Sequence, residues 1–69
     1  MDAKFSQLQH AEINGRNVWL YEIECPIGYV YIVESEDKQF MLHRSYESSL
    51  QTAEKRFETI VTKMVKGTL

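Results

Sequence analysis

Residues 28–45 read GYVYIVESEDKQFMLHRS, which we interpret as two apolar strands around a charged turn. Apolar side chains occupy both odd and even positions here, although successive side chains of a strand point to opposite faces of a sheet. A half-buried strand in a small protein normally keeps one polar face toward water. The stretch therefore predicts a sheet with two apolar faces, and one short helix can cover only one of them.

The strongest turn signal upstream is Asn14-Gly15, because both residue types tolerate the positive φ angles of a two-residue type I′ hairpin. It predicts a hairpin between strands at residues 7–13 and 16–24. Pro26 and Gly28 then interrupt the pattern, since proline has no amide hydrogen for a ladder and glycine permits a turn. We expect two more strands, at residues 29–34 and 39–43, joined by a polar turn at residues 35–38.

A helix is expected at residues 49–66, where apolar residues recur at three- and four-residue steps. The apolar stripe consists of Leu50, Ala53, Phe57, Ile60, Val61 and Met64. Ser48 and Gln51 fit a capping box, and Gly67 suits the position after the last turn. Residues 1–69 are therefore expected to form a single small α+β domain. It would be an antiparallel meander of three to four strands, followed by one C-terminal amphipathic helix packed on one face.

Composition is that of an ordinary globular domain, with 43% apolar and 26% charged residues in 69 positions. The sequence has no signal-peptide pattern, and no apolar run approaches the roughly 18 residues of a membrane span. Cys25 is the single cysteine, which favours a reducing compartment. We expect a cytoplasmic protein of bacterial or phage origin with no membrane association.

Side chains can be assigned to the two faces from the turns, because cross-strand partners share a face. If the loop at residues 25–28 has an even length, the predicted floor for the helix is Leu8, Trp19, Tyr21, Ile23, Val30 and Ile32. The opposite face is then predicted to bind a partner through Val18, Leu20, Tyr29, Tyr31, Val33, Phe40 and Leu42. An odd-length loop would exchange the strand faces, but either register leaves a second apolar face.

A large uncovered apolar face usually marks a contact surface, so we expect a small protein-binding or regulatory protein that forms a homodimer or binds another protein. The alternative that needs no partner is that the N-terminal segment of the chain folds over this face. Enzyme activity is not expected, because His10, His43 and Cys25 lack the neighbours of a catalytic or metal site. No cofactor is expected either, since three glycines provide no phosphate-binding loop.

The alternative function is a nucleic-acid-binding module that uses sheet aromatics. In that hypothesis bases would stack on Trp19, Tyr29 and Tyr31, and phosphates would meet Arg16, Lys38 and Arg44. The net charge of −2 disfavours it, since proteins that wrap a phosphate backbone usually carry a basic excess. Charge is also uneven along the chain, with acids on the central strands and lysines and arginine on the helix.

Overall fold

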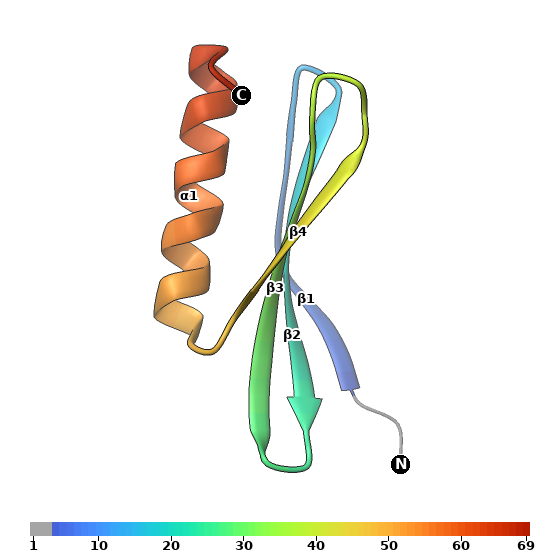
Figure 1. The fold of residues 1–69 in the computed structure, drawn as a ribbon, viewed down its shortest axis with the longest axis vertical. Helices are drawn as coiled ribbons and strands as arrows, with labels where there is room; N and C mark the ends of the chain where they lie inside the picture. Colours follow the sequence, from blue (N-terminus) through green and yellow to red (C-terminus); the bar gives the residue numbers. More distant parts are fainter. Residues whose placement is uncertain (1–3) are drawn as a thin grey trace.

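The computed structural model describes residues 4–69, which form a four-stranded antiparallel sheet followed by one helix that packs against it (Figure 1). The strands lie in the order β1-β2-β3-β4, so the sheet is a simple meander. The elements are β1 (Lys4–Ile13), β2 (Arg16–Cys25), β3 (Gly28–Glu36), β4 (Leu42–Glu47) and α1 (Leu50–Lys66). The predicted α+β architecture is confirmed.

The first two hairpins form as their turn residues predict. Asn14 and Gly15 have φ angles of 54° and 81°, as a type I′ turn requires, and Ile13 pairs with Arg16. Cys25 pairs with Gly28, so the second loop has an even length. The predicted place of Leu8 on the same face as Tyr21 assumes a regular first strand. In the structure Gln7 lies opposite Tyr21, because β1 contains a bulge between Gln7 and Gln9.

The last strand lies further along the chain than residues 39–43. β3 continues to Glu36, the turn occupies residues 37–41, and β4 runs from Leu42 to Glu47. Asp37 explains the longer turn, since its Oδ1 accepts hydrogen bonds from the backbone N–H groups of Gln39 (2.8 Å) and Met41 (3.0 Å). Phe40 takes the left-handed conformation in this turn, with φ of 62°.

The helix begins and ends close to the predicted positions. Its N-cap is Ser49, whose hydroxyl accepts a hydrogen bond from the backbone N–H of Thr52 at 3.2 Å, so the predicted capping box at Ser48 is wrong by one residue. Gly67 has a left-handed φ of 76°, and its N–H donates to the carbonyl of Met64. This C-cap is the one that the sequence predicts.

The helix covers the face opposite to the predicted one. The buried core consists of Val18, Leu20, Tyr31, Val33, Ala53, Phe57 and Met64. Val18 and Leu20 have no exposed surface at all. The prediction that Trp19, Tyr21, Ile23, Val30 and Ile32 form the floor of the helix is therefore wrong, and so is the assignment of Val18, Leu20, Tyr31 and Val33 to the uncovered face.

The position of the charged side chains gives a physical reason for this choice of face. Leu20, Val33 and Ser45 are cross-strand neighbours on the side of α1. The adjacent row on the other side contains Glu34 and Arg44. A helix over that row would have to remove the side chain of Arg44, which is 52% exposed, from water, and desolvating an ion costs free energy even within an ion pair. Packing on the row of Leu20 and Val33 leaves Arg44 in contact with water, although Arg16 is still buried on the helix side.

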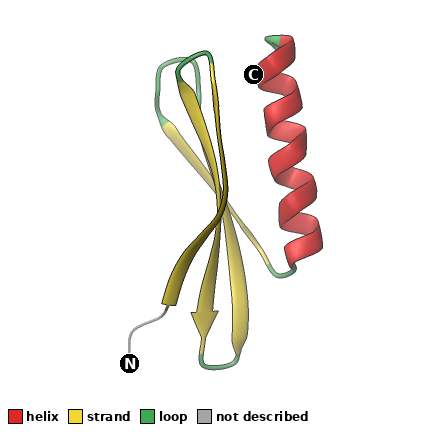
Figure 2. Cartoon of the chain, turned by 180° about the vertical axis from the view of Figure 1, so that it is seen from behind, coloured by secondary structure: helices red, strands yellow, loops and turns green. Residues whose placement is uncertain are grey.

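The molecule is elongated, with principal extents of 39 × 21 × 15 Å. In both ribbon views α1 lies beside only part of the sheet, and the turn between β2 and β3 projects beyond the N-terminal end of the helix (Figures 1 and 2). Ile27 at this turn is completely exposed. Among residues 4–69, no element covers one face of the sheet, and α1 covers the other face only toward one end.

Candidate interaction surface

The sheet face that points away from α1 is here called the open face. Its large apolar side chains come from all four strands: Phe5, Trp19, Tyr21, Ile23, Val30, Ile32, Leu42 and Tyr46. The strand register arranges them in rows across the sheet. One row is Gln7, Tyr21, Ile32 and Tyr46, and the next is Phe5, Ile23 and Val30. These two adjacent rows form one continuous apolar patch, and the row of Glu34 and Arg44 separates it from Leu42.

Exposure within the patch rises toward the outer strands. Ile32 is buried although no helix lies over it, because it stands between the larger side chains of Tyr21 and Tyr46 on the flanking strands. Phe5 on β1 and Tyr46 on β4 are 56% and 64% exposed. The open face therefore has a shielded centre and two exposed aromatic margins.

Aromatic contacts hold several of these side chains in place. The rings of Phe5 and Tyr21 lie 4.7 Å apart between centroids and are inclined by 55°, whereas His10 and Trp19 stack at 5.7 Å with 20° between their planes. Such pairs contribute about 0.5–1.5 kcal/mol beyond the burial of their area. Side chains that are already ordered lose less entropy when a partner binds.

A charged pair crosses the open face beside Trp19. The Nε and Nη2 groups of Arg44 both donate to Oε2 of Glu34, at 2.8 and 2.6 Å. The hydrogen bond to Glu34 raises the pKa of Arg44 above its ordinary value. Burial raises the pKa of the Tyr21 hydroxyl, and the nearby Glu34 carboxylate adds to this effect. Because Glu34 is paired, a partner that covers this row would not leave its charge isolated.

The seven residues of the predicted partner surface do not lie together. Val18, Leu20, Tyr31 and Val33 belong to the core under α1. Tyr29 is 52% exposed, but it lies on the helix side of the sheet, beyond the rows that form the core. Phe40 is exposed in the turn between β3 and β4, and Leu42 is the one member on the open face. Partner binding by Tyr29, Phe40 and Leu42 stays a prediction.

Sequence reasoning missed Phe5 and Tyr46, the most exposed aromatics of the open face. Tyr46 lies after the predicted last strand at residues 39–43, whereas in the structure it pairs with Ile32 inside β4. Phe5 precedes the predicted start of the first strand but pairs with Ile23. The alternating pattern of residues 42–47, with Leu42, Arg44 and Tyr46 on one side, was the available signal.

The residues of the nucleic-acid hypothesis are also scattered. Trp19 lies on the open face, whereas Tyr29 and Tyr31 lie on the other side of the sheet. Arg16 is buried and Arg44 is paired with Glu34. These aromatic and basic side chains therefore do not form one stacking surface.

Other kinds of site have little support in the described part of the chain. Within residues 4–69, no three His, Cys, Asp or Glu side chains gather closely enough to hold a metal ion. The single helix described is too short and too polar to cross a membrane. No known protein family, curated protein or solved structure matches this chain. The open face must therefore be interpreted from its own chemistry.

Proposed function

We propose that this protein has a non-enzymatic binding role, and that its open face binds another protein, most simply a second copy of the same chain. The observation that carries the proposal is the continuous apolar patch with Phe5 and Tyr46 exposed at its margins. No element among residues 4–69 covers this patch. Contiguous apolar patches of more than a few hundred Å² are unusual on monomers and commonly mark contact surfaces.

The size of the open face suits a stable interface. It spans four strands, of which two are 10 residues long. With strands about 4.8 Å apart and a rise of about 3.3 Å per residue, its footprint is on the order of 600 Å². A standard interface buries about 800 Å² on each partner. The accessible surface of projecting aromatic rings exceeds their flat footprint, so the two areas are comparable.

A second copy is favoured because the domain is small and its own core is marginal. A 60-residue domain buries only about 60% of the surface of its unfolded chain. A two-fold axis would set the same patch against itself and remove Tyr46, Phe5 and Leu42 from water in both copies. The paired Glu34 and Arg44 would enter that interface already hydrogen-bonded.

The test compares the same substitution on the two sides of the sheet. Tyr46→Glu places a charge on the open face, and Tyr29→Glu places one on the helix side at a similar exposure, 64% against 52% for the tyrosines. Sedimentation velocity over a range of concentrations should show a dimer for the wild type and for Tyr29→Glu. Tyr46→Glu should sediment as a monomer, because a buried unpaired charge disfavours association.

Far-ultraviolet circular dichroism should show that both variants stay folded, since neither side chain belongs to the core. A wild type that sediments as a monomer at every concentration would contradict self-association. If Tyr29→Glu dissociates the dimer and Tyr46→Glu does not, the interface lies on the helix side of the sheet, which would contradict the proposal.

A further inference from the structure

β4 is an edge strand whose outer side has no partner among residues 4–69. In the described sheet it pairs only with β3, and its register is regular over every pair from Leu42 to Glu47. Every second residue of such a strand directs its N–H and C=O groups outward. The other edge strand, β1, contains the bulge between Gln7 and Gln9, which is a common protection against strand addition. β4 is therefore the edge on which another strand can pair.

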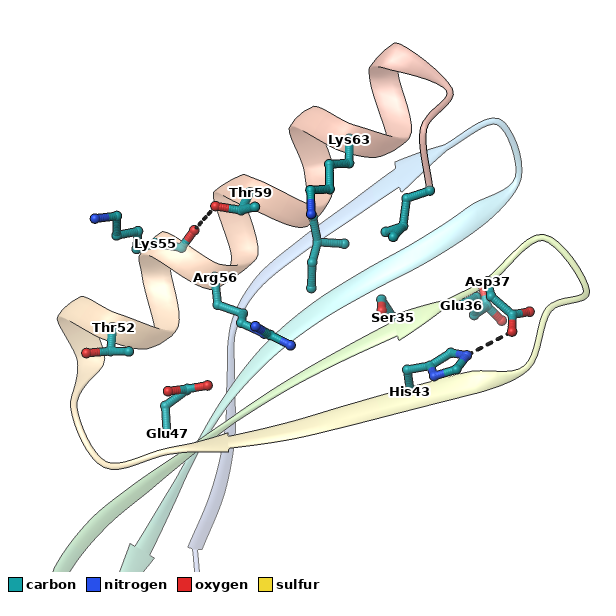
Figure 3. Close-up of a pocket in the computed structure, with 12 residues that line it drawn as sticks. Ser35, Glu36, Asp37, His43, Glu47, Thr52, Lys55, Arg56, Thr59 and Lys63 are labelled. Carbon is teal, nitrogen blue, oxygen red and sulfur yellow. Dashed lines mark hydrogen bonds and ion pairs between the residues drawn. The ribbon is translucent and has the colours of Figure 1, made fainter.

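The helix leaves this edge open. The sheet residues of the buried core beneath α1 are Val18 and Leu20 of β2 and Tyr31 and Val33 of β3. α1 therefore lies over the middle of the sheet. A cleft of about 570 Å³ lies beside it, and His43 and Glu47 of β4 are among the lining residues (Figure 3). A strand added to β4 would lie next to this cleft without displacing the helix.

The charges around the cleft are of mixed sign. Leaving His43 aside, its acids and bases are equal in number: Glu36, Asp37 and Glu47, and Lys55, Arg56 and Lys63. The whole chain carries a net charge of only −2. Such a surface selects neither a strongly acidic nor a strongly basic partner, whereas two copies of it can be complementary to each other if opposite charges meet.

The side chains of β4 favour one register for pairing with a second copy. Cross-strand partners share a face, so the two-fold axis of an antiparallel pair of identical strands passes through a residue. An axis through Arg44 would set that cation against itself. An axis through Ser45 places His43 opposite Glu47 of the second copy on the helix side. It also places Arg44 opposite Tyr46 on the open face, where a guanidinium and an aromatic ring attract each other.

The residue at that axis has a hydrogen-bonding group without a partner. Oγ of Ser45 is buried and makes no hydrogen bond within residues 4–69. A buried polar group that lacks a partner costs free energy. Serines that face each other across two strands can hydrogen-bond through their hydroxyl groups. A second Ser45 opposite the first would therefore supply the missing partner.

We propose that β4 pairs with β4 of a second copy as an antiparallel ladder, with the two-fold axis at Ser45. The two four-stranded sheets then form one sheet. Both helices lie on one side of it, about four strand spacings or 19 Å apart, which exceeds the helix width of about 10–12 Å. Both open faces lie on the other side and stay free, so this contact is separate from the proposed open-face interface. Because it uses one strand of 6 residues, it is the weaker contact and forms at higher protein concentration.

The test is disulfide formation between copies, in a Cys25→Ser background that removes the native thiol. Ser45→Cys is nearly isosteric, and the axis places its two copies directly opposite each other, about 5 Å apart between Cα atoms. Glu47→Cys lies on the same side of the same strand, but its two copies would be about 13 Å apart, too far for a disulfide. After oxidation of concentrated protein, non-reducing gels should show covalent dimers of Ser45→Cys forming at least about tenfold faster than those of Glu47→Cys.

The charge pairing is tested in the same Ser45→Cys chain. His43→Glu sets two carboxylates against each other on both sides of the axis and should slow cross-linking by about tenfold. Adding Glu47→Lys restores opposite charges across the ladder and should restore the rate. Loss of the contact between His43 and Asp37 could not be repaired in this way, so the rescue identifies the pair between copies.

The two interfaces fail separately. In a dimer through the open face, the two Ser45 residues lie on the outer sides of two sheets about 10 Å apart, so the Ser45→Cys thiols could not meet. A chain that dimerises through the open face but cross-links no faster at Ser45→Cys than at Glu47→Cys would overturn the edge contact alone. Folded His43→Glu protein that cross-links at the wild-type rate, or that Glu47→Lys fails to rescue, would overturn the register. If a charge variant does not fold, as judged by circular dichroism, the comparison of the two cysteine positions decides.

Discussion

At the scale of single residues, Asp37 organises the turn that separates β3 from β4. One carboxylate oxygen accepts the backbone N–H groups of Gln39 and Met41, and the other lies 2.8 Å from Nε2 of His43. The hydrogen bond with His43 is the largest effect on this carboxyl and lowers its pKa below 3.8, and the N–H of Met41 lowers it further. The ionised form of Asp37 therefore holds the turn.

The pKa of Asp37 can be tested directly. Because it is lower in the folded chain than its ordinary value of 3.8, its interactions stabilise the fold above pH 3.8 and are lost as pH falls below that value. His43→Ala should raise the pKa of Asp37 toward 3.8, as followed by NMR titration of the carboxyl carbon. His10→Ala should leave it unchanged, since His10 bonds to Asn17. An unchanged pKa in His43→Ala would show that the backbone N–H groups alone lower it.

At the scale of elements, the helix supplies much of the core through a few side chains. Phe57 is buried on α1, whereas Val65 is an apolar residue of the same helix that is mostly exposed. Phe57→Ala should lower the free energy of unfolding by about 3–5 kcal/mol, because it removes a buried ring and leaves a cavity. Val65→Ala should change it by only about 0.5 kcal/mol. The measurement is the urea midpoint, and a wild-type midpoint for Phe57→Ala would contradict this role of the helix.

The elements that the sequence predicts well are those with local signals. Asn14-Gly15 determines the first hairpin through its own backbone preferences, and Gly67 determines the end of the helix in the same way. The start of β4 differs from the predicted one because the turn before it depends on hydrogen bonds that the Asp37 carboxylate accepts from the backbone N–H groups two and four positions later. Composition gives the polarity of such a turn, but not its length.

At the scale of the whole molecule, local sequence patterns do not determine which face of the sheet the helix covers. Alternation separated Val18 and Leu20 correctly from Trp19 and Tyr21, and both sets are apolar. Because both sets are apolar, alternation alone gives no ground for choosing the face that the helix covers. Glu34 and Arg44 are ten residues apart in the chain and meet only in the register of β4, which the strand predicted at residues 39–43 does not give.

Self-association through the open face predicts that stability depends on protein concentration. A partner that binds only the folded chain stabilises it by about 2.7 kcal/mol at a hundred times its Kd. For a domain of this size, each kcal/mol raises Tm by roughly 4–8 °C. Scanning calorimetry over a hundredfold range of concentration should therefore show Tm rising by on the order of 10 °C.

The matched tyrosine variants make this prediction specific to one face. Tyr46→Glu should have a Tm that is independent of concentration and close to that of the dilute wild type, because the core under α1 is untouched. Tyr29→Glu should keep the wild-type dependence. If the thermal unfolding transitions of the wild type have the same Tm at all protein concentrations, folding is not coupled to association. The apolar rows around Tyr21 and Ile32 would then be stable in water without a partner, contrary to the proposed function.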